Sequence, residues 1–465
     1  MLAPGNHKVT CLTRATSCND RTTPGRAASF ADASAPGRGA GTLARVDTLL
    51  ARTADDAARA ARELLGVVRR TPVERARWLA DPLGVDVHLK CENLQRAGSF
   101  KIRGAYTRIF RLSDEERGRG VVAASAGNHA QGVALAASLL GVPATVFMPE
   151  GASLVKERAT RGYGADVRFA GTSVDAAVDA ALGYARSTGR VFVHPFDHPD
   201  VVAGQGSVGL ELLEQVPGVS TVVVCLGGGG LLAGIAATVK QARPDVTVVG
   251  VQAEGAAAYP PSLWAGHPVP LETMSTMADG IAIGRPGDLP FSIISRYVDE
   301  VVTVSEDAIS AALVRLLERN KLVCEPAGAV AVAALASGRL RPTGPVVATL
   351  SGGNIDPLLM LRVIRHGMVA DGRYLAFMTA IRDRPGALAQ LLARLADLGA
   401  NVLDVVHERT RSSLAVDDVE VLVVLETRGR AHREEILRAL AEQGYGVHQA
   451  VEPATAGGAS GAGAP

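Results

Sequence analysis

Hydrophobic and polar positions follow two different patterns along this chain, and one gives way to the other near residue 370. From about Val46 to Arg365, short β-branched runs alternate with Ala-rich helical runs. Strands are expected at Val85–Lys90, Gly120–Ala124, Ala144–Met148, Asp166–Phe169, Thr221–Leu226, Thr247–Val251 and Pro345–Leu350. Helices are expected at His129–Leu140, Ser173–Thr188 and Leu231–Gln241. This alternation predicts an α/β fold with largely parallel sheets, in which ligands bind at the loops that follow the strands.

The pattern after residue 370 predicts a separate and smaller domain. Its expected elements are a strand at Tyr374–Asp383, a helix at Pro385–Leu398, strands at Asn401–Glu408 and Val419–Glu426, a helix at Ala431–Gln443 and a strand at Gly446–Val451. A β-α-β-β-α-β order of roughly 80 residues is typical of a ferredoxin-like fold. We therefore place a catalytic domain at 46–370 and a second domain at 373–452.

Both ends of the chain are expected to be disordered. Residues 1–45 mix Pro, Gly, Ser and Thr with basic side chains and contain no apolar stretch of the kind that a secretory signal needs. The alternative is a transit peptide, although no amphipathic helix is evident. Residues 453–465 are rich in Gly and Ala and are expected to form a flexible tail.

Composition excludes several classes of protein. The formal net charge is +1, from 48 basic and 47 acidic residues, which argues against nucleic acid or an anionic membrane as a partner. The five cysteines include no C-x-x-C pair, so a reducing cytoplasm fits better than a disulfide scaffold. The uncharged stretch Val216–Val239 imitates a membrane span, but four glycines interrupt it, which favours a strand, a turn and a helix.

Lys101 is the first residue with a chemical signature. Ser99 is expected to cap a helix and to place Lys101 in its first turn. The positive field of a helix N-terminus disfavours the protonated amine, and a neutral amine is what Schiff-base chemistry needs. An exposed lysine at a helix start is the alternative interpretation.

Three loops at strand ends carry further candidates. The loop Ser125–His129 offers backbone and side-chain donors to an anion, and an ordinary capped turn is its alternative. The loop Gly227–Gly230 can wrap closely around a phosphate. It also fits the loose dinucleotide pattern G-x-G-x-x-A, with Glu254 after the next strand, so a nicotinamide site stays open. Ser351 can bond a buried heterocyclic nitrogen or cap a helix.

Taken together, these segments resemble the fold-type II pyridoxal-phosphate enzymes, and among them the threonine ammonia-lyases. The matching segments are Ser99–Ala105, Ala124–Gly132, Gly227–Leu231, Glu325–Gly328 and Ser351–Asn354. The resemblance implies two subdomains with parallel sheets, as in the tryptophan synthase β subunit, and pyridoxal 5'-phosphate as the cofactor. Pro260 stands where related racemases carry an acidic metal ligand, so no metal is expected, although Glu254 remains.

The resemblance also implies a role for each matching residue. Lys101 would form the Schiff base and act as the catalytic residue. The other cofactor-binding residues would be Phe100, Asn128, Gly227, Gly228, Gly229, Gly230, Leu231 and Ser351. Of these, Asn128 would bond the ring hydroxyl, the glycines with Leu231 would hold the phosphate, and Ser351 would face the pyridine nitrogen. The substrate would contact Ser125, Gly127, Asn128 and His129.

The activity that this resemblance implies is α,β-elimination. L-threonine would give 2-oxobutanoate and ammonia for isoleucine biosynthesis, and L-serine would give pyruvate as a side reaction. Serine racemase is an alternative of the same fold, but Ala126 stands where racemases carry a second serine. Threonine synthase shares the fold, a nicotinamide-dependent oxidoreductase is the competitor from another reaction class, and a catalytically inactive amino-acid sensor is the non-enzymatic alternative.

The segment Asp383–Leu388 resembles the first strand-to-helix turn of an ACT domain, where amino-acid effectors bind. Inhibition by isoleucine is the first expectation for the effector and activation by valine the second. Because ACT domains pair between subunits, a homodimer or homotetramer is expected, located in the cytoplasm.

Overall fold

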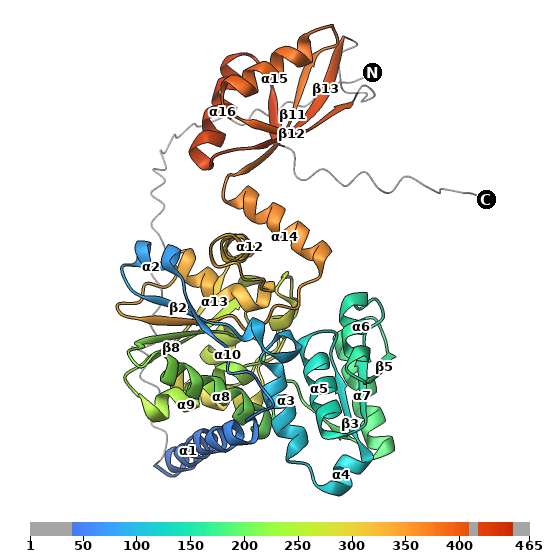
Figure 1. The fold of residues 1–465 in the computed structure, drawn as a ribbon, viewed down its shortest axis with the longest axis vertical. Coiled ribbons are helices and arrows are strands. Elements are labelled where there is room, and N and C mark those ends of the chain that lie inside the picture. The colour runs from blue at the N-terminus through green and yellow to red at the C-terminus, as the bar shows by residue number, and fades with distance from the viewer. Residues whose placement is uncertain (1–39, 409–416, 450–465) are drawn as a thin grey trace, which may run out of the picture. The chain divides into compact units, whose positions relative to one another are not determined.

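The computed structural model describes residues 40–408 and 417–449 (Figure 1). Of the predicted N-terminal extension, residues 1–39 lie outside the described residues. Residues 40–45 belong instead to the first helix, α1 (Ala40–Glu63). The predicted tail at 453–465 also lies outside the described part of the chain.

A six-stranded sheet forms the larger half of the catalytic domain. Its strands, in spatial order, are β1 (Val73–Arg75), β2 (Val87–Lys90), β10 (Val346–Thr349), β7 (Thr221–Cys225), β8 (Thr247–Ala253) and β9 (Glu300–Val304). All neighbours pair in parallel except the edge strand β1. The central strands are rich in valine because helices cover both faces of the sheet. Figure 1 shows α8 (Pro199–Gln215) and α9 (Gly230–Ala242) on one face, with α12 (Glu306–Arg315) and α13 (Pro326–Ala336) on the other.

A smaller parallel sheet forms the second half. Its strands, in spatial order, are β5 (Asp166–Phe169), β4 (Ala144–Met148), β3 (Val121–Ala124) and β6 (Val191–Phe192). Helices α5 (Asn128–Leu140), α6 (Leu154–Gly162) and α7 (Val174–Thr188) flank it. Helix α3 (Lys101–Phe110) packs against both α5 and α8, so it joins the two halves. The predicted α/β architecture is confirmed.

The other helical elements connect these layers. The α-helices are α2 (Arg77–Leu83), α4 (Asp114–Arg119), α10 (Tyr259–Ala265), α11 (Asp288–Tyr297) and α14 (Pro357–Ala370). The short 3-10 turns are Glu92–Leu94, Arg96–Gly98, Glu254–Ala256 and Asp279–Ile281, and Leu316–Asn320 forms a π-helix.

A buried ion network fixes α3 to the larger half. Arg103 is completely buried, and its guanidinium donates to Glu92 Oε1 and Oε2 at 2.8 Å each and to Glu211 Oε1 at 2.7 Å. Lys90, also fully buried, pairs with the same Glu211. Buried charges of this kind are tolerated only when each finds a partner. The network therefore ties the helix that begins with Lys101 to β2 and α8.

The C-terminal domain is a four-stranded antiparallel sheet in the order β12-β13-β11-β14. Its elements are β11 (Tyr374–Arg382), α15 (Ala387–Asp397), β12 (Asn401–Glu408), β13 (Asp418–Glu426), α16 (Arg430–Glu442) and β14 (Val447–Gln449). The alternating side chains of β11 and β13 pack under the leucine stripe of α15. This arrangement confirms the predicted ferredoxin-like unit.

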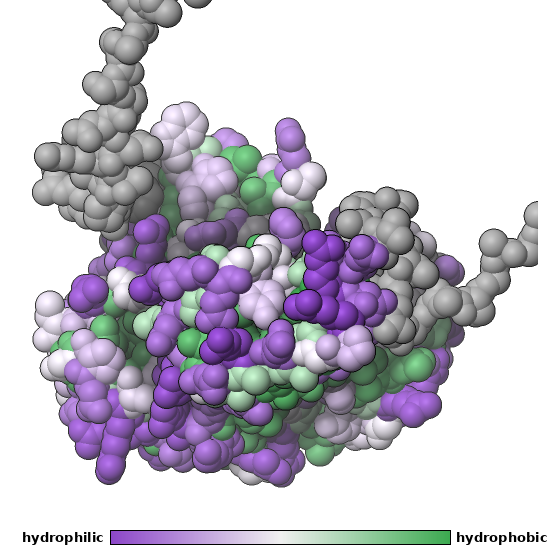
Figure 2. All heavy atoms as spheres, turned by 90° about the horizontal axis from the view of Figure 1, so that it is seen from above, coloured by the Kyte–Doolittle hydropathy of each residue, from purple (hydrophilic) through white to green (hydrophobic). Residues whose placement is uncertain are grey.

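The stretch that imitates a membrane span is divided as expected into β7, a glycine turn and α9. Among the helices of the described residues, none has the length and apolar character needed to cross a bilayer. The face shown in Figure 2 carries hydrophilic residues over much of its area, with smaller groups of hydrophobic side chains between them.

Candidate functional site

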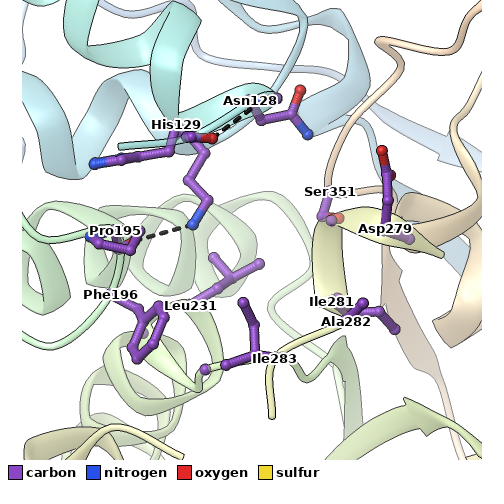
Figure 3. A pocket seen from close by; sticks show the side chains of 18 of the residues that line it. Asn128, His129, Pro195, Phe196, Leu231, Asp279, Ile281, Ala282, Ile283 and Ser351 are labelled. Carbon is purple, nitrogen blue, oxygen red and sulfur yellow. Dashed lines mark hydrogen bonds between the residues drawn. The ribbon is translucent and has the colours of Figure 1, made fainter. Parts of the chain in front are cut away.

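A cavity of about 340 Å³ lies where the loops that follow the strands of both sheets meet. The loop after β3 contributes Ala124–His129, the loop after β7 contributes Gly227–Leu231, and Ser351 follows β10. Phe100 and Lys101 complete the wall from the start of α3. In Figure 3, Pro195 and Phe196 line one side of the cavity, and Ser351 and Asp279 line the opposite side. All predicted site residues thus surround one space.

Lys101 is the first residue of α3, and its Nζ donates a hydrogen bond to the Pro195 carbonyl oxygen at 2.9 Å. Burial lowers the pKa of the Lys101 amine to about 8, against the smaller opposing effects of Cys225 and Glu325. The neutral amine is therefore easier to reach than in a free lysine, as expected from the sequence, but mainly because the group is desolvated. The ring of Phe100 lies beside it, with its centroid 5.2 Å from Nζ.

The prediction that Ser99 caps α3 is wrong. The N-cap position is Phe100, and no side chain caps the helix. Ser99 is extended, with φ of −162°, and forms a β-bridge with Gly352 after β10. Its buried hydroxyl finds no hydrogen-bond partner among the described residues. Pairing across the site thus overrides the local capping preference.

The glycine loop after β7 is packed tightly against its neighbours. A Cβ added at Gly228 would lie 2.4 Å from the Phe196 ring, and one at Gly229 would lie 2.0 Å from Tyr259 Oη. Gly229 also has φ of +101°, which disfavours any other residue. The first amides of α9 have no carbonyl partner within the helix and carry its positive field. The loop is therefore built to receive an anion such as phosphate.

The loop after β3 is held by its own side chains. Ser125 Oγ accepts from the Gly127 N–H at 3.1 Å, and Asn128 begins α5. Asn128 Nδ2 donates to Glu325 Oε1, and Asn128 Oδ1 accepts from Asn354 Nδ2 at 2.8 Å. Both ends of the Asn128 amide are therefore engaged inside the cavity wall.

His129 is turned into the protein rather than left free. Its Nε2 lies 2.8 Å from the Val193 carbonyl oxygen, and burial lowers its pKa to about 3, so the ring is neutral. The residue still lines the cavity. A contact of His129 with substrate stays a prediction.

Ser351 is buried just after β10, where it lines the cavity together with Cys225. The alternative of a helix cap is wrong, because the next helix, α14, begins at Pro357 with Asp356 as its cap. Ser351 is thus a hydroxyl that faces the cavity, in agreement with a role opposite a ring nitrogen.

Several lining residues were not assigned a role from the sequence. Glu325 is only 3 % exposed, and burial raises its pKa to about 7. Lys156 pairs with Asp279 at the cavity wall, and Ser153 donates to Asp356 at 2.9 Å. A signal existed for Glu325, since it is a single acid between an apolar run and the Pro-Ala-Gly start of a helix. Lys156 lies in α6 and Asp279 in the 3-10 turn Asp279–Ile281, more than 120 residues apart in the chain, so no local sequence pattern joins them.

No metal centre is evident in the part of the chain that the structure describes. No cluster of three or more His, Cys, Asp or Glu side chains there is arranged to hold an ion. Glu254, the one acid that remained as a possible metal ligand by resemblance to the racemases, is exposed.

Comparisons with known proteins agree with this geometry. The family model for pyridoxal-phosphate dependent enzymes matches residues 64–352, and the ACT domain model matches residues 379–443. The L-threonine ammonia-lyase of Thermotoga maritima is 48 % identical over 396 residues, which are 85 % of this chain and 98 % of that protein.

Two solved structures are similar as well. The processed form of threonine deaminase isoform 2 from Solanum lycopersicum has a TM-score of 0.66 and 37 % identity, covering 69 % of this chain and 88 % of that one. Maize serine racemase has a TM-score of 0.64 and 35 % identity, covering 66 % of this chain and 95 % of that one.

Proposed function

This chain belongs to the family of pyridoxal-phosphate dependent enzymes and carries an ACT domain, and we propose that it is an L-threonine ammonia-lyase under amino-acid control. Its reaction is the conversion of L-threonine to 2-oxobutanoate and ammonia, with L-serine giving pyruvate in a side reaction. The observation that carries the proposal is Lys101, whose half-buried side chain places its amine in one cavity with the glycine loop.

The cavity fits pyridoxal 5'-phosphate by the chemistry of its donors. Gly227 to Gly230, with the amide of Leu231, would hold the phosphate, because their tight packing leaves only backbone N–H groups to face it. Lys101 supplies the amine, Asn128 an amide and Ser351 a hydroxyl. When bound, the cofactor supplies an aldehyde that captures amines and a ring that takes up negative charge. We do not propose a nicotinamide site at the glycine loop, because the model of the pyridoxal-phosphate dependent enzymes matches the segment that contains this loop.

Lys101 is the base of the proposed reaction. Since its amine has a pKa of about 8, a substantial fraction is neutral near physiological pH and can take the α-proton of the substrate. The carbonyl of Pro195 holds Nζ at 2.9 Å and fixes its direction. Tuning a lysine by burial in this way is a recurring means of obtaining an amine that is active near neutral pH.

The substrate carboxylate would bind at the loop Ser125–Asn128. This loop ends at the first turn of α5, whose free N–H groups favour an anion. Ser125 and Gly127 are half-buried and line the cavity, so a substrate can reach them.

Serine racemase is the second candidate, since a structure with that name shares the fold. Ala126 lines the cavity in this chain and carries no hydroxyl that could return a proton from that side. The identity of 48 % to the Thermotoga maritima ammonia-lyase, against 35 % to the maize racemase, also favours the elimination.

The effector site of the ACT domain would be a cavity of about 290 Å³ at the turn after β11, which Asp383, Arg384 and Leu388 line together with His407. Charged groups of both signs beside an apolar side chain suit a free amino acid. Isoleucine as inhibitor is the first choice, consistent with a role in isoleucine biosynthesis. A homodimer or homotetramer paired through this domain, and a cytoplasmic location, stay predictions.

The test is turnover of L-threonine and L-serine by the purified full-length protein, with and without isoleucine. We expect 2-oxobutanoate from L-threonine at a higher kcat/KM than pyruvate from L-serine, and no product from Lys101→Ala. Racemisation of L-serine without ammonia release would contradict the proposal, and so would unchanged turnover by Lys101→Ala.

A further inference from the structure

Glu325 is a buried acid for which the proposed reaction has no role. It precedes α13, and its backbone N–H donates to the Gly352 carbonyl oxygen at 3.1 Å. Its carboxyl lines the cavity, is almost completely buried and makes no ion pair with any described residue. Burying a carboxylate without a cation beside it costs free energy, so the protonated, neutral form of the Glu325 carboxyl is favoured.

The side chain that Glu325 touches is the amide of Asn128, and that amide can point in only one direction. Asn354 Nδ2 donates both to the Ala97 carbonyl oxygen at 2.7 Å and to Asn128 Oδ1 at 2.8 Å. Because a carbonyl oxygen can only accept, the Ala97 contact fixes the orientation of the Asn354 amide. Asn128 must then turn Oδ1 to Asn354 and Nδ2 to Glu325, which accepts its hydrogen bond.

One donor of Asn128 is left over by this arrangement. An amide nitrogen carries two hydrogens, and Glu325 Oε1 takes one of them. The second hydrogen remains available within the cavity. Gly352 closes the arrangement from behind, since a Cβ there would lie 2.2 Å from Glu325 Oε1 and 3.0 Å from Asn128 Nδ2. Any side chain at position 352 would therefore displace the carboxyl of Glu325 or the amide of Asn128.

Several charged and titratable groups act on the Glu325 carboxyl. Burial has the largest effect and raises the pKa of the Glu325 carboxyl, and Asp279 raises it further, whereas the hydrogen bond from Asn128 and the charges of Lys156 and Lys101 lower it. The thiols of Cys225 and Cys324 are near enough for Glu325 to act on them electrostatically, and burial raises the pKa of each, so both stay neutral. The balance leaves the carboxyl able to gain or lose a proton near neutral pH.

We propose that Glu325 and Asn354 are positioning residues that together aim the Asn128 amide at the cofactor ring, and that a proton held at Glu325 sets how strongly this amide donates. An ionised Glu325 carboxylate accepts a stronger hydrogen bond from the Asn128 amide, which makes the second N–H of that amide a weaker donor. It also places a negative charge near the cofactor ring. Both effects weaken the remaining donor bond, so cofactor binding is tighter when Glu325 is protonated. The inference rests on the proposed function only in requiring the cofactor.

The first test is a cofactor titration of the apoenzyme between pH 6 and 8.5, with the wild type and Glu325→Gln in parallel. Glutamine keeps an oxygen that accepts from Asn128 but cannot ionise. We expect equal dissociation constants at pH 6 and, at pH 8.5, a wild-type constant about threefold or more above that of the variant. A ratio that stays constant with pH would overturn the role of the Glu325 proton.

Asp279→Asn is the matched control, because it removes a charge near Glu325 without touching Asn128. Loss of that negative charge lowers the pKa of Glu325. In Asp279→Asn, the change of cofactor affinity with pH is therefore expected at a lower pH than in the wild type. An upward shift would contradict the assignment of the proton to Glu325.

The second test is Asn354→Asp, which replaces the donor facing Ala97 and Asn128 with an acceptor of the same shape. We expect cofactor affinity to fall about tenfold or more at constant pH. If this variant does not fold, as judged by thermal unfolding of the apoenzyme, Asn354→Ala is used, with an expected loss of roughly threefold. Wild-type affinity in the folded variant would overturn the positioning role.

These readouts are separate from lyase activity. A protein that binds the cofactor with the expected pH dependence but releases no ammonia from L-threonine refutes the proposed function and leaves this inference standing. Active wild-type enzyme whose variants bind the cofactor as the wild type does refutes the inference alone.

Discussion

The two glycine-containing loops of the cavity both follow a buried strand but differ in how tightly they are packed. At each of Gly227 to Gly230, an added Cβ would meet another atom within 3.0 Å, with Phe196, Tyr259 and Ile281 among the neighbours. At Gly127, no heavy atom lies within 4 Å of an added Cβ. The first loop follows a strand of the six-stranded sheet, and the second follows a strand of the smaller sheet.

This difference separates two tasks. A tightly packed loop keeps its amides in place before an anion arrives, which suits a permanently held phosphate. A loop with open space beside Gly127, held by the Ser125 hydroxyl, can adjust when a substrate enters. We therefore expect the glycine loop of the larger half to be the more rigid part of the site, and the loop of the smaller half to be the more adaptable part.

The largest expected effect is a loss of stability when the ion network that anchors α3 to the larger half of the catalytic domain is broken. Arg103→Met leaves Glu92 buried without its cation, so we expect the free energy of unfolding to fall by about 3–5 kcal/mol, measured by urea denaturation. Arg243→Met, which breaks an exposed pair with Asp245, is the control and should leave stability nearly unchanged. Equal losses in the two variants would show that the network does not anchor the helix.

Gly229→Ala tests the packed loop. The new methyl would overlap Tyr259 Oη and strain a residue with φ of +101°. We expect cofactor affinity to fall roughly 100-fold, equivalent to about 3 kcal/mol, in an equilibrium titration of the apoenzyme. A loss of cofactor affinity smaller than about threefold would mean that the loop can shift to accommodate the methyl group.

The pH dependence tests the burial of Lys101. Because its folded-state pKa is lowered to about 8, the neutral amine is abundant above that pH and scarce below it. We expect kcat for L-threonine to be about tenfold lower at pH 7 than at pH 9. A profile that stays flat across this interval would place the working base elsewhere.

Gly127→Ala should have the smallest effect and is the counterpart of Gly229→Ala. With open space around the new methyl, cofactor affinity is expected to stay within about twofold of the wild type. KM for L-threonine is the quantity to follow, since this loop would meet the substrate. A loss of cofactor binding equal to that of Gly229→Ala would remove the distinction between the loops.

The sequence predicts much of this architecture, because its longer buried strands and its glycine turn have clear local patterns. Buried parallel strands such as β7 are continuous β-branched runs, and the glycine turn after β7 marks its own position. The short strands β1 and β6 and the edge strand β9 were not predicted, because two or three residues, or a half-buried edge, carry little periodic signal.

The errors at the site have a common cause. Ser99 was expected to cap a helix, but the bridge to Gly352 takes its backbone. The pKa of Lys101 is lowered as expected, but chiefly by burial that only the assembled cavity provides. The importance of Glu325 likewise depends on Asn128, which is distant in the chain. Local patterns predict which loops meet, and contacts between distant segments decide what each side chain does there.

The most direct test of the central claim is to locate the covalent bond between cofactor and protein. The holoenzyme is reduced with borohydride, digested and analysed by mass spectrometry, with Lys101→Ala treated in the same way. The account predicts a reduced pyridoxal-phosphate adduct on Lys101, and no adduct at any position in the variant. An adduct on another lysine, or an unmodified Lys101 in protein that is active and coloured, would contradict it.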